Sequence, residues 1–176
     1  MERASAEKHE FFAGEVFAMA GATREHNLLV ANALALLWNA LRGRACEVYP
    51  ADLRVRIPAT DQYVYPDVSV ACDGPRFEDD TLDTLLNPAV IVEVLSDSTE
   101  DYDRGKKFEG YQTVESLRDY VMVAQRVARV VHYAREDDGS WRMRVYGPGQ
   151  SLTLTACDAR LAVDELYERV LPPRGA

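Results

Sequence analysis

The sequence predicts a mixed α/β fold in which a central β-sheet is flanked by helices. Residues 64–71 and 88–95 are apolar runs typical of interior strands, and amphipathic stretches alternate with strands along the 176-residue chain. Strands covered on both faces are almost continuously hydrophobic, whereas a helix at a surface carries one apolar stripe. We therefore expect one domain over residues 1–176, with a helix on each side of the sheet and residues 172–176 as a frayed tail.

The first third of the chain contains the clearest helix. Residues 10–20 are expected to form a helix end followed by a strand. Thr23 then suits an N-cap and Gly43 a helix end, and between them apolar side chains recur at helical spacing, at Val30, Leu34, Leu37, Trp38 and Leu41. Residues 46–57 alternate between apolar and polar side chains, which predicts one half-buried strand.

The elements after residue 64 follow from similar patterns. The strands at 64–71 and 88–95 are separated by a polar loop that contains a short apolar segment. Ser98 and Asp101 then match a capping box, which predicts a helix to about Thr113. The expected C-terminal elements are a buried strand at 119–124, a hairpin of 127–134 with 141–146, and a short helix at 163–170.

The composition limits the compartment and the partners that we expect for the protein. No apolar run approaches the roughly 18 residues that span a bilayer, and the charged first ten residues lack the apolar segment of a signal peptide. We therefore expect a cytoplasmic protein that contacts no membrane. The net charge of −9 counts against indiscriminate nucleic-acid binding. A local basic strip would still supply a phosphate-facing surface; its candidate members are Arg54, Arg56, Arg104, Lys106 and Lys107.

The cysteine pattern indicates neither a disulfide framework nor structural zinc. Cys46, Cys72 and Cys157 are odd in number, far apart in sequence and without a nearby histidine cluster. We expect free and mostly buried thiols.

Two acidic residues interrupt the apolar strands. Asp67 lies within residues 64–71, and Glu93 follows the run Val90–Val92. A buried carboxylate needs a cation or a metal ion to offset its desolvation, and a pair of carboxylates suits a hard ion such as Mg²⁺ or Mn²⁺. A structural acid in a turn is an equally good interpretation of Asp67 alone.

Helix geometry distinguishes the two lysines that follow Glu93. At about 100° per residue, Lys107 shares a helical face with Tyr111 and Val114, whereas Lys106 points away from it. Lys107 is therefore expected to face the sheet and the acids. The alternative is a lysine whose long stem lies along the helix edge and whose ammonium reaches solvent.

Several motifs together resemble the Uma-two family, a bacterial group assigned to the PD-(D/E)XK nuclease superfamily. The resemblance covers nearly the whole chain, from about Glu10 to Val170. The motifs that carry it are Tyr65–Val68, Val92–Ser96, Tyr102–Phe108 with Tyr111, and upstream Gly14–Val16, Met19–Gly21 and Glu25–Asn27.

The resemblance implies a restriction-endonuclease-like core with a metal site. It makes Asp67 and Glu93 the metal ligands, with the Val94 carbonyl completing the set. It makes Lys107 the catalytic lysine, because Leu95 stands where the wider superfamily has its lysine. Glu15 matches the acid that the superfamily often contributes from its N-terminal region, although a surface strand acid fits equally.

Two further side chains are candidates for supporting the site. His26 follows the predicted N-cap Thr23, and we expect it to contact and orient a metal ligand or, as the simpler interpretation, to cap the helix start. Tyr111 lies one turn after Lys107 and would orient the lysine or a water, unless it only packs in the core.

These observations predict a Mg²⁺-dependent or Mn²⁺-dependent endonuclease that hydrolyses phosphodiester bonds of DNA, with RNA left open. A homodimer is expected, because twofold symmetry suits the cutting of two strands. The main alternative is an inactive nuclease-fold domain that binds or regulates, and Leu95 is the chief support for it. A third possibility is a partner that acts only within a complex.

Overall fold

The computed structural model describes residues 3, 5, 8–12, 14–18, 21–95 and 103–171. Its centre is a six-stranded sheet in the order β11-β10-β9-β8-β6-β3. Only β8 and β9 pair in parallel, so the sheet is mixed, as predicted. The strands are β3 (Cys46–Pro50), β6 (Val68–Cys72), β8 (Val90–Leu95), β9 (Asp119–Ala124), β10 (Val130–Arg135) and β11 (Trp141–Tyr146).

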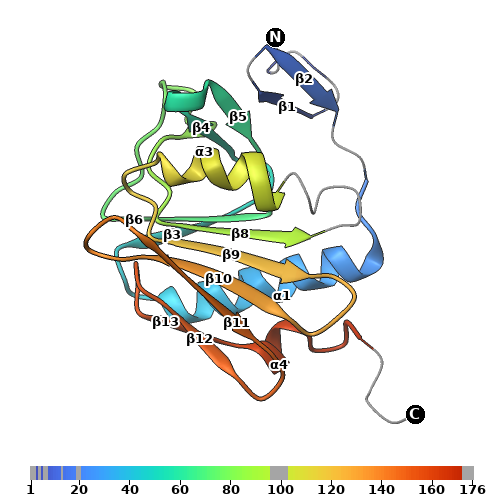
Figure 1. Ribbon diagram of the computed structural model, residues 1–176. Coiled ribbons are helices and arrows are strands. Elements are labelled where there is room, and N and C mark those ends of the chain that lie inside the picture. The colour runs from blue at the N-terminus through green and yellow to red at the C-terminus, as the bar shows by residue number, and fades with distance from the viewer. Residues whose placement is uncertain are drawn as a thin grey trace.

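Helix α1 (Arg24–Leu41) covers one face of this sheet (Figure 1). The helix begins as its sequence predicts, because the Thr23 hydroxyl accepts a hydrogen bond from the His26 N–H at 3.2 Å. Beyond its end, Gly43 has a φ of +77°, which glycine adopts without strain. The buried face of the helix consists of Leu29, Ala33, Leu37 and Leu41. These side chains form the first core with the inward residues of the sheet.

A second sheet lies on the other side, together with helix α3 (Phe108–Gln112) (Figure 1). Its strand order is β2-β1-β5-β4-β7. The strands are β1 (His9–Phe12), β2 (Glu15–Ala18), β4 (Arg54–Ile57), β5 (Gln62–Val64) and β7 (Thr84–Leu85). Apolar residues of both sheets and of α3 form the second core, so the six-stranded sheet is buried on both faces.

Several predicted boundaries are wrong. Within residues 10–20, those that the structure describes belong to the hairpin β1–β2 and not to a helix end, with Gly14 at a φ of +97° in the turn. Residues 46–57 are two strands, β3 and β4, that belong to different sheets. The stretch 64–71 is likewise divided, because β5 ends at Val64 and β6 begins at Val68.

The helix predicted to begin at Ser98 is described only from residue 103 onward. Its capping box, Ser98 with Asp101, lies outside the described residues. The segment Asp103–Lys107 is a turn of π-helix, labelled η3, and α3 continues directly from it. Wide turns of this kind are frequent at functional sites, because they shift the direction of the side chains that follow.

The C-terminal region contains a hairpin that periodicity did not reveal. Strands β12 (Ser151–Leu154) and β13 (Ala159–Ala162) pair with each other and pack against α1, and the final helix α4 (Val163–Leu166) is shorter than predicted. Short strands of four residues give too few alternations to distinguish them from loops. No helix in the described ranges has the length and apolar character needed to cross a membrane.

The prediction of free thiols is wrong for one pair. Cys46 and Cys72 lie directly opposite each other on β3 and β6, with Cα atoms 4.0 Å apart, and form a disulfide. Antiparallel register brings the two sulfurs together although the residues are distant in sequence. Cys157 is a free, buried thiol, and burial raises its pKa.

Asp119 is the most completely buried acid in the described part of the chain and joins β9 to the β12–β13 turn. It is 0% exposed and receives four hydrogen bonds. The donors are His132 Nε2 at 2.7 Å, Thr155 N–H at 2.9 Å, the Thr155 hydroxyl at 3.0 Å and Ala156 N–H at 2.8 Å. A carboxylate with this many donors is a structural anchor that offsets its own desolvation.

Tyr167 gives a pH-dependent prediction. Its buried hydroxyl lies 2.5 Å from the Ala124 carbonyl oxygen, and burial raises its pKa from 10.0 to about 12. The folded protein therefore keeps this proton while the unfolded chain loses it, so stability is present below pH 10 and is lost as pH rises towards 12. In wild type, about 1.4 kcal/mol per pH unit should disappear over this window.

The measurement compares urea unfolding of wild type and Tyr167→Phe at several pH values. Phenylalanine has no proton to lose, so the stability gap between the two proteins should be constant below pH 10 and narrow above it. A gap that stays constant into strong alkali would contradict the prediction.

Candidate active site

The site is built around a buried ammonium between two carboxylates. Lys107 is 4% exposed, and its Nζ lies 3.0 Å from Glu93 Oε1 and 2.9 Å from Glu10 Oε1. Glu93 is 3% exposed. Charges this deeply buried are retained only with close partners of opposite sign, and the two acids supply them.

The alternation of side chains along β8 directs Glu93 toward Lys107. Val90, Val92 and Val94 belong to the core on the α1 side, whereas Ile91 and Leu95 belong to the core on the α3 side. Side chains alternate along a strand, so Glu93 faces α3 with the latter pair. Lys107 is the last residue of η3 and contacts Glu93 from the α3 side of the sheet. This is the side that its predicted helical position indicated.

Tyr111 adds a hydrogen-bond donor to Glu93. Its hydroxyl lies 3.4 Å from Glu93 Oε1, and the ring is fully buried. Burial, followed by the negative charge of Glu93, raises the pKa of Tyr111 well above its ordinary value. The hydroxyl therefore stays protonated near neutral pH and is able to donate to the carboxylate.

Close packing of α3 on the five-stranded sheet supports this arrangement. A side chain at Gly110 would place its Cβ 2.8 Å from the amide oxygen of buried Gln62 on β5. Glycine therefore permits an approach that any larger residue would obstruct.

Asp67 lies at the bend between β5 and β6. Its Oδ2 accepts a hydrogen bond from the Val94 N–H at 2.7 Å, and His26 Nε2 lies 3.3 Å from the same oxygen. The β6–β8 register pairs Val68 with Val92, so one further step places Asp67 opposite Glu93. The Val94 N–H donates within the plane of the sheet, whereas His26 reaches Asp67 from α1, the helix on the face opposite to the one that Glu93 faces.

Sequence reasoning missed Glu10. The structure places Glu15, the predicted N-terminal acid, exposed on β2, which is the edge strand of its sheet. Glu10 lies one strand further in, is 9% exposed, and contacts Lys107. The signal available in the sequence was an acid directly followed by the large apolar residues Phe11 and Phe12, which favour a strand.

The predicted basic strip is not assembled as expected. Arg54 is buried and pairs with Asp83, and Arg56 pairs with Glu78, so both serve the five-stranded sheet. Lys107 is enclosed by acids, whereas Lys106 is exposed. The Arg104 side chain lies outside the described residues.

A metal ion at this site would depend on few protein ligands. Within the described ranges, no three His, Cys, Asp or Glu side chains lie close enough together to hold one. Asp67 and Glu93 occupy opposed register positions, and two carboxylates are a number that suits Mg²⁺, because this ion usually keeps several waters and takes one or two carboxylates. Both contacts of Asp67 involve Oδ2, so its Oδ1 remains open for a cation as far as the described residues show.

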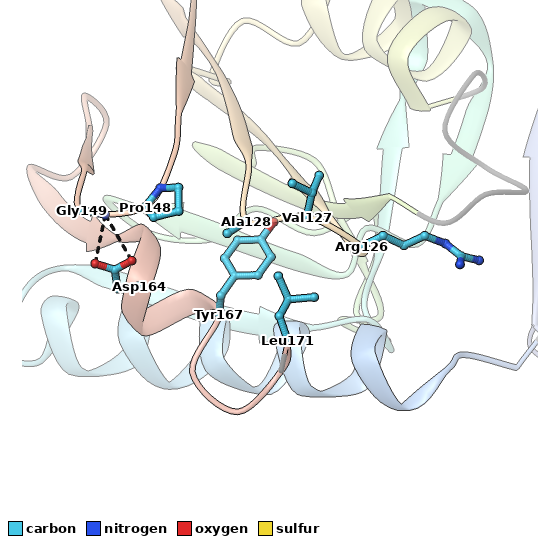
Figure 2. Close-up of a pocket in the computed structure, with 8 residues that line it drawn as sticks. All are labelled: Arg126, Val127, Ala128, Pro148, Gly149, Asp164, Tyr167 and Leu171. Carbon is cyan, nitrogen blue, oxygen red and sulfur yellow. Dashed lines mark hydrogen bonds between the residues drawn. The ribbon is translucent and has the colours of Figure 1, made fainter. Parts of the chain in front are cut away.

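A separate surface hollow of about 750 Å³ does not contain these acids (Figure 2). It lies beside α4, and its lining includes Arg126, Val127 and Leu171. Two of its polar side chains already have partners within the protein. Asp164 accepts a hydrogen bond from the Gly149 N–H, as Figure 2 shows, and the Tyr167 hydroxyl contacts the Ala124 carbonyl. It has no arrangement of groups that suggests catalysis.

Comparison with known proteins shows the family of the chain. The model of the Uma2 family, described as "Putative restriction endonuclease", matches residues 1–164. Among uncharacterised proteins of Synechocystis sp., slr1290 is 39% identical over 166 residues, covering 94% of this chain and 86% of its own. A second, sll1609, is 37% identical over 140 residues, covering 80% of this chain and 79% of its own.

A solved structure shares the fold. The crystal structure of a putative nuclease belonging to DUF820 from Anabaena variabilis matches with a TM-score of 0.78. The match covers 95% of this chain and 93% of that chain at 14% sequence identity. The likeness confirms the predicted nuclease-like α/β fold.

Proposed function

Because the chain belongs to the Uma2 family, we propose that it is a metal-dependent endonuclease that hydrolyses phosphodiester bonds of DNA. The observation that carries the proposal is the Lys107 ammonium 3.0 Å from Glu93, on a strand whose neighbour presents Asp67. Two acids and a buried lysine at one end of a sheet are the groups that phosphodiester hydrolysis with a metal ion requires.

In this proposal Asp67 and Glu93 hold Mg²⁺ or Mn²⁺, with the Val94 carbonyl as a third ligand. The ion, when bound, polarises a phosphoryl oxygen and lowers the pKa of a bound water. The Val94 N–H and His26 fix the orientation of Asp67, and the Tyr111 hydroxyl does the same for Glu93. Fixed ligands reduce the reorganisation needed when the ion binds.

Lys107 supplies positive charge next to the ion. Its ammonium has two carboxylate partners, which favour the protonated form. We therefore assign it to orienting the nucleophilic water and stabilising the charge that develops on phosphorus, and not to removing a proton. Proton transfer then falls to the water shell or to the substrate phosphate.

The test is cleavage of plasmid DNA with Mg²⁺ or Mn²⁺, and with EDTA as the metal-free condition. Asp67→Asn and Glu93→Gln keep the side-chain shapes but remove ligand charge, so each should lower cleavage by about 100-fold or more. The matched controls are Asp80→Asn and Glu109→Gln, which make the same changes at exposed positions and should cut as wild type does. Cleavage that survives EDTA, or that survives Glu93→Gln, would contradict the proposal.

The second candidate function is a nuclease-fold domain that binds without cutting. Leu95 in the usual lysine position and the small donor set favour it. Binding of Mg²⁺ without nicking of any plasmid, at any metal concentration, would support this function over the first. A homodimer is part of the endonuclease proposal, and light scattering of the purified protein tests it.

A further inference from the structure

Glu10 contacts both Lys107 and the segment that leads to Asp67. Its Oε1 accepts a hydrogen bond from the Tyr65 N–H at 3.0 Å and contacts Lys107 Nζ at 2.9 Å. We propose that Glu10 is a positioning residue: it holds the Lys107 ammonium in place when Glu93 binds the divalent cation. This inference rests on the proposed function of the same site.

The need for such a residue follows from competition for Glu93. Without an ion, Lys107 and Tyr111 both contact Glu93 Oε1. A divalent cation on Glu93 withdraws charge from that oxygen and repels the nearby ammonium. A lysine whose counter-ion was Glu93 alone would then be displaced from the site at the moment when its charge is required.

Glu10 is suited to retaining Lys107 because it is fixed independently of Glu93. It belongs to β1, in the five-stranded sheet, whereas Glu93 belongs to β8, in the six-stranded sheet. The β1–β5 register and the Tyr65 N–H hold it from one side. Tyr65 also precedes Pro66 and Asp67, so the same contact secures the chain that leads to the first predicted metal ligand.

A double-mutant cycle tests whether Glu10 acts through Lys107. Glu10→Gln keeps the size of the side chain and an oxygen for Tyr65 N–H but removes the charge. It should lower kcat by about 100-fold, the effect of misplacing a catalytic group by about 1 Å, and leave KM for DNA unchanged. In a Lys107→Met background the same change should have no further effect on kcat. An equal loss in both backgrounds would overturn the inference, because Glu10 would then act without the lysine.

A second measurement is independent of cleavage. The ¹⁵N–¹H signal of the Lys107 ammonium, assigned by its absence in Lys107→Met, reports exchange of its protons with water. In wild type the signal should persist when Mg²⁺ is added; in Glu10→Gln it should broaden or vanish on the same addition. Glu109→Gln, an exposed charge on α3, should behave as wild type does.

The outcomes separate the inference from the proposed function. If Mg²⁺ binds and no DNA is cut, the endonuclease proposal fails, and the ammonium signal alone decides the role of Glu10. A Lys107 signal that responds identically to Mg²⁺ in wild type and Glu10→Gln would overturn the inference even in an active enzyme. Failure of Mg²⁺ to bind at all would overturn both.

Discussion

Replacing Lys107 with methionine is expected to lower the free energy of unfolding by about 3–5 kcal/mol, the usual cost of removing one partner from a buried ionic group. Methionine fills a similar volume but leaves Glu10 and Glu93 buried without the cation that lies 2.9 and 3.0 Å from them. Denaturation in guanidinium chloride measures the change. Cleavage should fall by about 100-fold or more in the same variant.

The neighbouring residue supplies the control. Lys106 is exposed, so Lys106→Met should change stability by less than about 0.5 kcal/mol. Adding Glu10→Gln to Lys107→Met should restore part of the lost stability, because it removes one of the two uncompensated charges. Equal stability of Lys107→Met and wild type would show that the three charged groups are not buried together.

The second large effect is expected at Asp119. Asp119→Asn should lower the free energy of unfolding by about 3–5 kcal/mol. The amide has the shape of the carboxylate, but its NH₂ group would replace one of the two oxygens and point at a donor of that oxygen, such as the Ala156 N–H at Oδ2. Thermal unfolding followed by circular dichroism measures the change, and in the variant the β12–β13 turn should be the first region to lose amide protection.

Asp158→Asn is the matched control, because it makes the same change on the same turn at an exposed position. Its stability should stay within about 0.5 kcal/mol of wild type. A small effect of Asp119→Asn would mean that the turn does not depend on this carboxylate.

The elements that local pattern specifies were predictable. Thr23 and the apolar stripe to Leu41 define α1, and the run Val90–Val92 defines a strand buried on both faces. The prediction that Lys107 rather than Lys106 faces the sheet is confirmed, although the two lysines lie in a π-helical turn and not in the α-helix assumed for the angle between them. These predictions require no knowledge of distant contacts.

Two of the features that were missed near the core depend on pairing between segments. The Cys46–Cys72 disulfide follows from the register of β3 with β6, and register is not encoded in either strand alone. Glu10 and Glu15 lie on one short hairpin, and only the order of strands in the sheet determines that Glu10 is the inner one. The metal, the substrate and the roles of Asp67, Glu93 and Lys107 remain predictions that the experiments above test.

The contact between Glu10 and Lys107 has a consequence for the order of events during synthesis. Glu10 leaves the ribosome about a hundred residues before its cation, Lys107. Until Lys107 emerges, burial of Glu10 carries an uncompensated desolvation cost, so the β1–β2 hairpin should stay undocked while later strands form. A hairpin that is made before most of the sheet is therefore expected to be among the last elements to reach its native position.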